Sequence, residues 1–273
     1  MAVTMRCTVI GGAGFVGRRL AARLLAAGRE VSVPRRDDPG LLSRDLGQVY
    51  YCAGLTADYA DRPYDTVQAH VGLLADVLRA GRFSRLVYLS STRLYDSAPQ
   101  MPADEAAPLM LSPANPRALY DLSKALGENL CLTLAPGRAA VARLSCVFDW
   151  EHGAPGFLSE WLQQATSQRE LWLDTDAAVM RDYIHLDDVV TALVALADAP
   201  DTGIFNVASG TNVSNGELAE LFGRRGWQVT LARASAPLVA PQCRVQRLHA
   251  LGVVPRDARD IVDARLAEIA KWN

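Results

Sequence analysis

This chain lacks the features that would direct a protein to a membrane or to nucleic acid. No apolar run among its 273 residues is long enough to cross a bilayer. Its only apolar stretch near the N-terminus is rich in glycine, so we do not expect a signal peptide. The net charge of −2 is spread along the chain without a basic block, which argues against nucleic acid or a membrane surface as a partner.

Cysteine is scarce and scattered. The chain has five cysteines, an odd number, far apart and without the spacing of metal ligands. Cys7 and Cys52 lie in apolar, strand-like runs, where a thiol is usually a small core residue. We therefore expect no metal site and a cytoplasmic protein in a reducing environment. Half of the residues are hydrophobic, enough for one large α/β domain, alone or with a small lobe.

What the chain does have, at its start, is a glycine-rich turn. Residues 7–10 are apolar, three glycines follow at intervals of three, and residues 18–27 carry apolar side chains at helical spacing. This order predicts a strand, a tight turn and a helix. The glycines permit an unusual backbone conformation, close approach of a pyrophosphate and tight helix packing, and the free N–H groups at the helix start would face the phosphates. The predicted dinucleotide contacts here are Gly11, Gly14, Phe15, Val16 and Gly17.

The end of the second predicted strand, residues 30–33, bears on the choice of cofactor. In dinucleotide folds an acidic residue about 20 positions past the glycines binds the ribose 2′-hydroxyl, whereas an arginine there can hold a 2′-phosphate. Arg35 and Arg36 occupy this place, so we predict NAD(P) binding with a preference for NADP. Asp37 or Asp38 could still reach the ribose, and the arginines could form an ordinary solvated turn.

The next segment is unusually short. Only residues 39–47 separate this turn from the following predicted strand, residues 48–52. A full crossover needs about 10–12 residues, so the sheet is expected to lack one strand or one covering helix on the adenine side. Ala53 and Gly54 follow the strand, and we predict that these small residues let the cofactor approach.

Hydrophobic periodicity predicts the remaining elements. Helices are expected at residues 65–79, 117–134, 186–199, 215–222 and 256–272. Strands are expected at residues 85–89, 139–147 and 203–208, with a loop at 97–116 and an insertion off the sheet at 149–180. Ser214 and Glu217 have the spacing of a capping box.

A Tyr-x-x-x-Lys pair is the second strong signal. Tyr120 and Lys124 are four apart in a predicted helix, so they lie on one face, one turn apart. We predict that the Lys124 ammonium, helped by an oxidised nicotinamide, lowers the pKa of Tyr120 from about 10. Tyr120 could then act as a general acid or base near neutral pH, and Lys124 could also donate to the ribose hydroxyls.

Together these residues resemble the extended branch of the short-chain dehydrogenase/reductase superfamily, the NAD-dependent epimerase/dehydratase family of nucleotide-sugar enzymes. The resemblance covers nearly the whole chain. The matching segments are residues 11–17, 89–95, 143–148, 181–188, 206–210 and 251–255, with the pair Tyr120 and Lys124. The combination is specific to the family but not to a substrate.

The resemblance implies a mechanism on a sugar. Tyr120 would take or give the proton of the C4 hydroxyl, while Ser91 hydrogen-bonds the same oxygen and stabilises the developing charge. Thr92 is a close alternative to Ser91, and Ser90 is expected to be structural. The nicotinamide would carry the hydride. His185 is expected to be a packing residue. The implied substrate contacts are Thr92, Cys146 and Arg181, the last as a phosphate contact.

Three departures from the family pattern stand close to these positions. Thr92 and Arg93 occupy the places of an Asp-Glu pair that members eliminating water across C5–C6 carry, which disfavours 4,6-dehydration. Cys146 stands where the family usually has asparagine, so one hydrogen bond is altered. Asp149 and Trp150 replace a Gly-Pro pair, so the loop entering the sugar site differs.

We therefore predict an α/β fold, a Rossmann-type doubly wound parallel sheet with a small C-terminal substrate-binding lobe. Residues 1–148 and 181–210 would form the NAD(P)-binding domain, and residues 149–180 and 211–273 the lobe. The predicted reaction is epimerisation of a nucleotide sugar at C4, with NADPH-dependent reduction of a 4-keto sugar as the alternative. A non-catalytic, cofactor-binding regulatory protein is a third hypothesis. The family also implies a homodimer, formed through the two long helices before residue 135.

Overall fold

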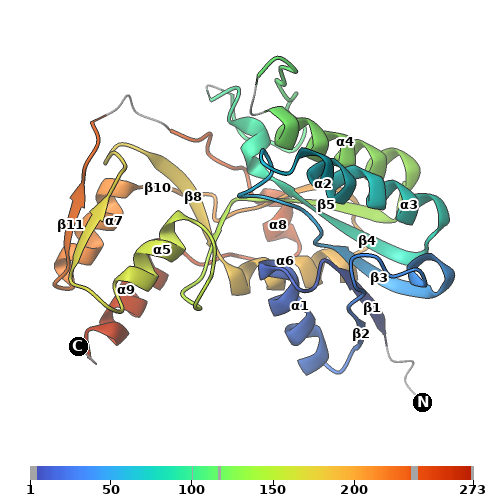
Figure 1. Cartoon of the computed structure of the whole chain (residues 1–273), viewed down its shortest axis with the longest axis horizontal. Helices are drawn as coiled ribbons and strands as arrows, with labels where there is room; N and C mark the ends of the chain where they lie inside the picture. The colour runs from blue at the N-terminus through green and yellow to red at the C-terminus, as the bar shows by residue number, and fades with distance from the viewer. Residues whose placement is uncertain (1–4, 100, 116–117, 235–238, 272–273) are drawn as a thin grey trace.

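A six-stranded parallel sheet organises the chain. The computed structural model describes residues 5–99, 101–115, 118–234 and 239–271. The strand order is β2-β1-β3-β4-β5-β9, and every neighbouring pair is parallel. The strands are β1 (Arg6–Ile10), β2 (Glu30–Ser32), β3 (Asp45–Tyr51), β4 (Arg82–Ser91), β5 (Ala139–Leu144) and β9 (Gly203–Val207). Helices cover both faces (Figure 1), so the predicted α/β, Rossmann-type fold is confirmed.

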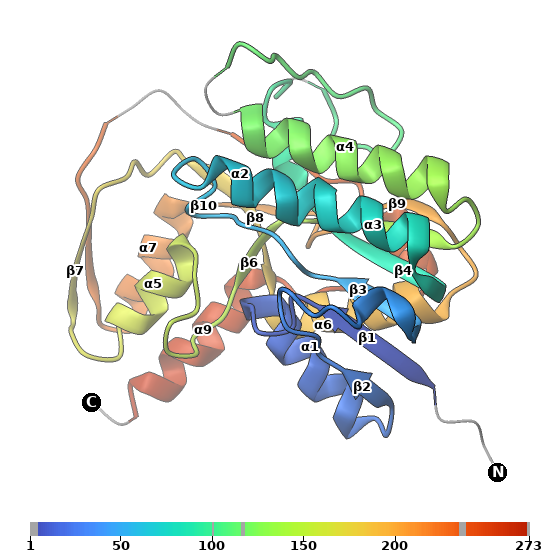
Figure 2. The same ribbon diagram turned by 45° about the vertical axis from the view of Figure 1, so that its right-hand side comes forward.

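The alternation of side chains along each strand explains the two helical layers. One face carries α1 (Phe15–Ala26) and α6 (Leu186–Asp198), and the other carries α2 (Pro63–Val67), α3 (Leu73–Ala80) and α4 (Ala118–Leu134). Figure 2 shows α2, α3 and α4 side by side. Tyr50 belongs to the core of the first face and its neighbour Tyr51 to that of the second, since successive strand residues point to opposite faces. The apolar run of β3 therefore indicates burial on both sides.

The segment between β2 and β3 is where the fold is reduced. Residues 33–44 contain only a short 3₁₀ turn, η1 (Leu41–Ser43), before β3 begins. The usual doubly wound order places a further strand outside the second one, whereas β2 is the edge strand in the part of the chain described here. The prediction of a missing element on this side is confirmed, and both the strand and its crossover helix are absent from these residues.

Several segments of the described chain after Leu144 form a smaller layered unit beside the sheet (Figure 1). It contains a three-stranded sheet, a two-stranded sheet and three helices around a core that includes Trp161, Phe222 and Trp227. Its elements are β6 (Cys146–Phe148), α5 (Phe157–Gln164), β7 (Glu170–Leu173), β8 (Met180–His185), β10 (Asn212–Ser214), α7 (Asn215–Arg224), β11 (Gln228–Leu231) and α9 (Ala258–Ile269). The predicted capping box is present, because Ser214 Oγ accepts from Glu217 N and the Glu217 carboxylate accepts from Ser214 N. The domain boundaries given above stay a prediction.

Several predicted elements have different limits in the structure. The strand expected at 139–147 is two strands, because the chain leaves the large sheet after Leu144 and β6 pairs with β8 instead. The helix expected at 65–79 is interrupted by a π-helical turn, η2 (Gln68–Gly72), between α2 and α3. α4 begins at Ala118 and α9 ends at Ile269. Arg117 and Trp272, which the predicted helices also included, lie outside the described residues. A short helix, α8 (Gln246–Ala250), adds Leu248 to the core of the large sheet.

Candidate active site

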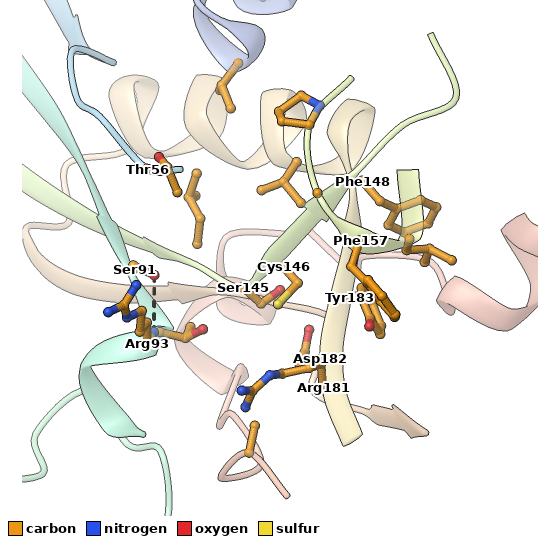
Figure 3. A pocket seen from close by; sticks show the side chains of 18 of the residues that line it. Thr56, Ser91, Arg93, Ser145, Cys146, Phe148, Phe157, Arg181, Asp182 and Tyr183 are labelled. Atoms are coloured by element: carbon orange, nitrogen blue, oxygen red, sulfur yellow. Dashed lines mark hydrogen bonds between the residues drawn. The ribbon is translucent and has the colours of Figure 1, made fainter. Parts of the chain in front are cut away.

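A cavity of about 770 Å³ opens between the carboxyl ends of the large-sheet strands and the smaller unit. This is the edge at which ligands bind in doubly wound sheets. Figure 3 shows Ser91 and Arg93 at one side of it, Phe157 and Tyr183 at the other, and Cys146 between. Eleven of the predicted site residues line the cavity: Gly14, Phe15, Val16, Gly17, Gly54, Ser91, Thr92, Tyr120, Lys124, Cys146 and Arg181. Gly11, Ala53, Arg35 and Arg36 are not part of its wall.

The glycine turn forms a cradle that side chains would fill. Gly11 has φ of +82°, and a Cβ on it would lie 2.5 Å from Ala53 N. A Cβ on Gly17 would lie 2.4 Å from Gly11 O, so both positions require glycine. Gly14 is the N-cap of α1 and has no side chain to cap it. The N–H groups of the first helical turn therefore stay available to a phosphate, which fits a dinucleotide.

The predicted 2′-position lies in a separate hollow of about 440 Å³ that Arg35, Asp37, Asp38 and Arg44 help to line. Asp38 is already engaged, since its Oδ1 accepts from Gly40 N at 2.9 Å and its Oδ2 pairs with Arg44. The hydrogen bond from Arg44 and that from the Gly40 amide lower the pKa of Asp38. The side chains of Arg35, Arg36 and Asp37 are exposed. A group entering this hollow would thus meet the exposed side chains of both Arg35 and Asp37.

Tyr120 and Lys124 point from α4 towards the end of β4, and both are nearly buried. The Lys124 ammonium donates to Leu89 O at 2.9 Å and lies 5.1 Å from the ring centroid of Tyr88. Burial lowers the pKa of Lys124 to about 8. A Cβ on Gly54 would lie 3.2 Å from Lys124 Nζ, so the small residue at this position leaves room beside the ammonium.

The pKa of Tyr120 is raised, because burial outweighs the opposing effects of the Ser91 hydroxyl and of the Arg93 charge. The prediction of a lowered pKa is therefore wrong for the protein alone. Lys124 is engaged by the Leu89 carbonyl, and Arg93 is the cation with the larger effect on Tyr120. Its guanidinium carbon lies 4.9 Å from the centroid of the Tyr120 ring.

The serines at the end of β4 make different contacts, and the catalytic role of Ser91 stays a prediction. Ser91 Oγ accepts from Arg93 N at 3.2 Å (Figure 3), and Ser91 lines the cavity together with Tyr120. Thr92 begins the 3₁₀ turn η3 (Thr92–Tyr95) and lines the cavity beside it. Ser90 points away and donates to Glu128 Oε1 at 2.5 Å, so its role is structural. Ser91 and Thr92 thus both line the cavity with Tyr120, whereas Ser90 does so with its hydroxyl engaged by Glu128.

His70 is a site residue that the sequence did not reveal. Its Nε2 accepts from Leu55 N at 3.2 Å, so the proton lies on Nδ1, which donates to Ser123 Oγ at 2.8 Å. Ser123 Oγ in turn donates to Tyr120 O at 2.9 Å. Burial and the Lys124 charge lower the pKa of His70 to about 3, which keeps it neutral. Its ring meets that of Tyr120 edge-on at 5.4 Å.

The substrate side of the cavity is formed by the smaller sheet. The Cys146 thiol faces the cavity. Because the surrounding protein shields the thiol from bulk water, its pKa is raised to about 11 and it stays protonated. Arg181 faces Asp96 at 3.8 Å. Its neighbour Asp182 is buried and accepts from the amides of Ser209 and Gly210. These contacts hold β8 in place and leave the Arg181 guanidinium at the cavity wall.

His185 packs and caps, as predicted. It is 1% exposed, its ring centroid lies 4.7 Å from that of Trp150, and its Nδ1 accepts from Asp187 N at the start of α6. It does not line the cavity. Trp150 takes part in this packing. Its side chain, one of the departures from the family pattern noted above, therefore packs within the lobe and not at the predicted sugar site.

Three further features concern the described part of the chain as a whole. Its helices include none that is both long and apolar enough to cross a membrane. All five cysteines are free thiols. No group of three or more potential metal ligands occurs among the residues that the structure places.

Comparison with known proteins gives a consistent result. Residues 7–208 match the model of the NAD dependent epimerase/dehydratase family. UDP-glucuronic acid decarboxylase 1 of Arabidopsis thaliana is 26% identical over 254 residues, which cover 80% of this chain and 57% of that protein. UDP-glucose 4-epimerase of Corynebacterium glutamicum is 27% identical over 267 residues, covering 80% of this chain and 79% of that protein. The chain thus spans little more than half the length of the decarboxylase that it matches.

Solved structures with the same fold include two proteins with bound ligands. One is UDP-N-acetylglucosamine 4-epimerase from Methanobrevibacter ruminantium M1 in complex with UDP-N-acetylmuramic acid, with a TM-score of 0.78, 18% identity and 98% of both chains covered. Another is RMD from Pseudomonas aeruginosa complexed with NADPH, with a TM-score of 0.74, 24% identity and coverage of 99% and 100%. At these identities the likeness shows the fold.

Proposed function

Because this chain belongs to the NAD dependent epimerase/dehydratase family of enzymes, we propose that it epimerises a nucleotide sugar at C4. The carrying observation is that Ser91, Tyr120 and Lys124 together line the cavity whose wall also contains the glycine turn. The related UDP-glucose 4-epimerase of Corynebacterium glutamicum supports the choice of reaction.

The turn at residues 11–17 would hold NAD(P), and the free N–H groups at the start of α1 would bind its pyrophosphate. Gly54 and Ala53 give room next to it, and Lys124 donates to the ribose. The bound nicotinamide supplies an acceptor and donor of hydride. The protein's own task is to orient the sugar and to move a proton at its C4 oxygen.

The proton is moved by Tyr120. Its hydroxyl lies within reach of the cavity, where it takes the proton of the C4 hydroxyl and later returns one to the same oxygen. Ser91 Oγ donates to that oxygen and stabilises its developing charge. Thr92 and Cys146 contact the sugar, and Arg181 binds the diphosphate of the nucleotide from the opposite wall.

The proposal includes a preference for NADP over NAD. Asp38 is engaged by Gly40 and Arg44, while Arg35 and Arg36 are exposed beside the hollow. This arrangement suits a 2′-phosphate better than a 2′-hydroxyl. The same observation favours a second candidate, the NADPH-dependent reduction of a 4-keto sugar, since an enzyme that consumes its reductant would use NADPH.

One experiment separates the candidates. The purified protein is denatured, and any released nucleotide is identified by absorbance and mass, while the native protein is incubated with UDP-glucose and the products are separated by chromatography. Near-stoichiometric NAD(P) together with formation of the C4 epimer supports the epimerase. An empty protein that binds NADPH and leaves UDP-glucose unchanged supports the reductase. A protein that binds neither cofactor would support the regulatory alternative.

We also propose a homodimer formed through α2, α3 and α4. These helices lie side by side on the outer face of the sheet (Figure 2), and they expose Tyr64, Val67, Leu126 and Leu134. Exposed apolar groups of this kind favour association. Sedimentation should give a dimer for the native chain and a monomer for Leu126→Glu, and a monomeric native chain would contradict the proposal.

A further inference from the structure

Arg93 occupies a place in the active site that the proposed mechanism does not use. It follows Ser91 by two residues, and its backbone N–H donates to the Ser91 hydroxyl. Its side chain folds back over the ring of Tyr120, with the guanidinium carbon 4.9 Å from the ring centroid. The side chain is 22% exposed, so most of its charge is withdrawn from water at the residue that would move the proton.

Two other side chains fix this guanidinium. Arg93 Nη2 donates to the Tyr59 hydroxyl at 3.1 Å, and Arg93 Nε lies 3.3 Å from Asp121 Oδ1. The Tyr59 and Tyr120 rings are 5.4 Å apart. Tyr59 is itself anchored, because its carbonyl accepts from Thr66 Oγ1 at 3.1 Å. Tyr59 and Asp121 thus together hold the Arg93 guanidinium against Tyr120.

Asp121 places the opposite charge next to the same ring, since it directly follows Tyr120 on α4. Its side chain is 13% exposed. Arg93 acts to lower the pKa of Tyr120, and Asp121 acts to raise it. The two charges therefore oppose each other at one phenol, and an opposite charge within about 4–6 Å has an effect of about 1–3 pH units when it is unopposed.

The other polar groups around Tyr120 are arranged differently. Lys124 is bound to the Leu89 carbonyl, and His70 is neutral. Cys146 stays protonated, with a pKa of about 11, and the pKa of Tyr88 is raised by burial. Among the residues that the structure describes, the titratable or charged groups that face Tyr120 are Arg93 on η3, Asp121 and Lys124 on α4, His70 on η2, Tyr59 before α2, Tyr88 on β4 and Cys146 on β6.

We propose that Arg93 is a positioning residue that stabilises the phenolate of Tyr120, and that its ion pair with Asp121 sets how strongly it does so. The inference rests on the proposed role of Tyr120 in proton transfer. Lys124 then serves mainly the ribose, while Arg93 supplies the positive charge that the phenol needs. Removing Arg93 takes away a charge that favours the phenolate, and removing Asp121 takes away one that disfavours it, so the two single changes act in opposite directions.

The test is a titration of Tyr120 in the protein alone. Phenolate absorbance is followed against pH, and the signal of Tyr120 is obtained as the difference from the same protein carrying Tyr120→Phe. Arg93→Met should shift the midpoint upward by about one pH unit and Asp121→Asn downward by about one. Arg93→Lys should stay close to the native protein, and the double change Arg93→Met with Asp121→Asn should fall between the single ones.

A matched control is Arg79→Met, which breaks an exposed ion pair with Asp76 on α3 and should leave the midpoint unchanged. Loss of folding exposes Tyr120 and lowers the midpoint of its titration, so the upward shift of Arg93→Met cannot come from unfolding. If the Arg93→Met variant does not fold, Arg93→Gln replaces it. Shifts in the same direction for Arg93→Met and Asp121→Asn, or no shift in either, overturn the inference. Turnover of UDP-glucose that survives Tyr120→Phe would instead overturn the proposed function, so the two failures are distinguishable.

Discussion

The two ends of the predicted cofactor site are constructed in different ways. At the nicotinamide end, buried side chains from α4, β4 and η2 fix each reactive group through several contacts, as Lys124 and His70 illustrate. At the adenine end, exposed side chains in residues 33–44 stand where a strand and helix would normally lie. A packed end fixes the geometry that chemistry requires, whereas an exposed loop can change cofactor preference without disturbing the core.

At the nicotinamide end, we expect the largest effect on turnover from removing the hydroxyl oxygen of Tyr120. Tyr120→Phe should reduce turnover by about 10²–10⁴-fold, because the general acid and base is lost, and leave cofactor affinity within about twofold. Turnover of UDP-glucose and titration with NADPH measure the two quantities. The matched control is Tyr64→Phe on the exposed side of α2, which should keep full activity. Equal losses of turnover and cofactor affinity would contradict the assignment.

The glycine turn, which joins the two ends, is tested by a pair of matched changes. Gly11 and Gly28 both have positive φ, +82° and +75°, but a Cβ meets Ala53 N at 2.5 Å in the first and nothing within 4 Å in the second. Gly11→Ala should lower the free energy of unfolding by about 1–3 kcal/mol more than Gly28→Ala and abolish cofactor binding. Thermal melting with and without NADPH checks this, and equal behaviour would show that the close approach is unimportant.

The buried histidine adds a pH dependence to the nicotinamide end. The pKa of His70 is lowered to about 3 by burial and Lys124, against about 6.5 in the unfolded chain. The folded state therefore binds fewer protons than the unfolded chain. The contribution of neutral His70 to the free energy of unfolding is complete above about pH 6.5. It is lost as the pH falls towards 3, by at most about 1.4 kcal/mol per pH unit. Denaturant unfolding at several pH values should show a shallower fall in His70→Gln. Parallel curves would contradict the assigned tautomer and pKa.

The smallest effect is expected at the exposed end. Arg35→Ala should weaken NADP binding about tenfold, the cost of one charge-assisted contact, and leave NAD binding almost unchanged. Arg23→Ala, an exposed change on α1, is the control. Fluorescence titration with both cofactors measures the ratio of affinities. A loss of the same size for NAD would place Arg35 outside the 2′-position.

Local sequence signals predicted what depends on local geometry. The glycine spacing, the Tyr120 and Lys124 pair, the shortened segment after β2 and the Ser214 capping box all involve residues close in the chain, so pattern alone locates them. The continuous apolar run at 139–147 could not reveal the change of sheet after Leu144, because burial in either sheet needs the same residues. Likewise, the raised pKa of Tyr120 and the hydrogen bonds of His70 with Leu55 and Ser123 arise from contacts between distant segments.

The short edge strand also has a consequence for how molecules meet one another in solution. A sheet that ends early exposes unpaired N–H and C=O groups, which can recruit a strand from another chain. Here β2 has only three residues, its Glu30 carboxylate is paired with Arg6 at 3.0 Å, and Pro34 offers no N–H to extend the ladder. The edge is too brief and too charged to serve as a template for aggregation, so the fold can lose an outer strand and still resist edge-to-edge association.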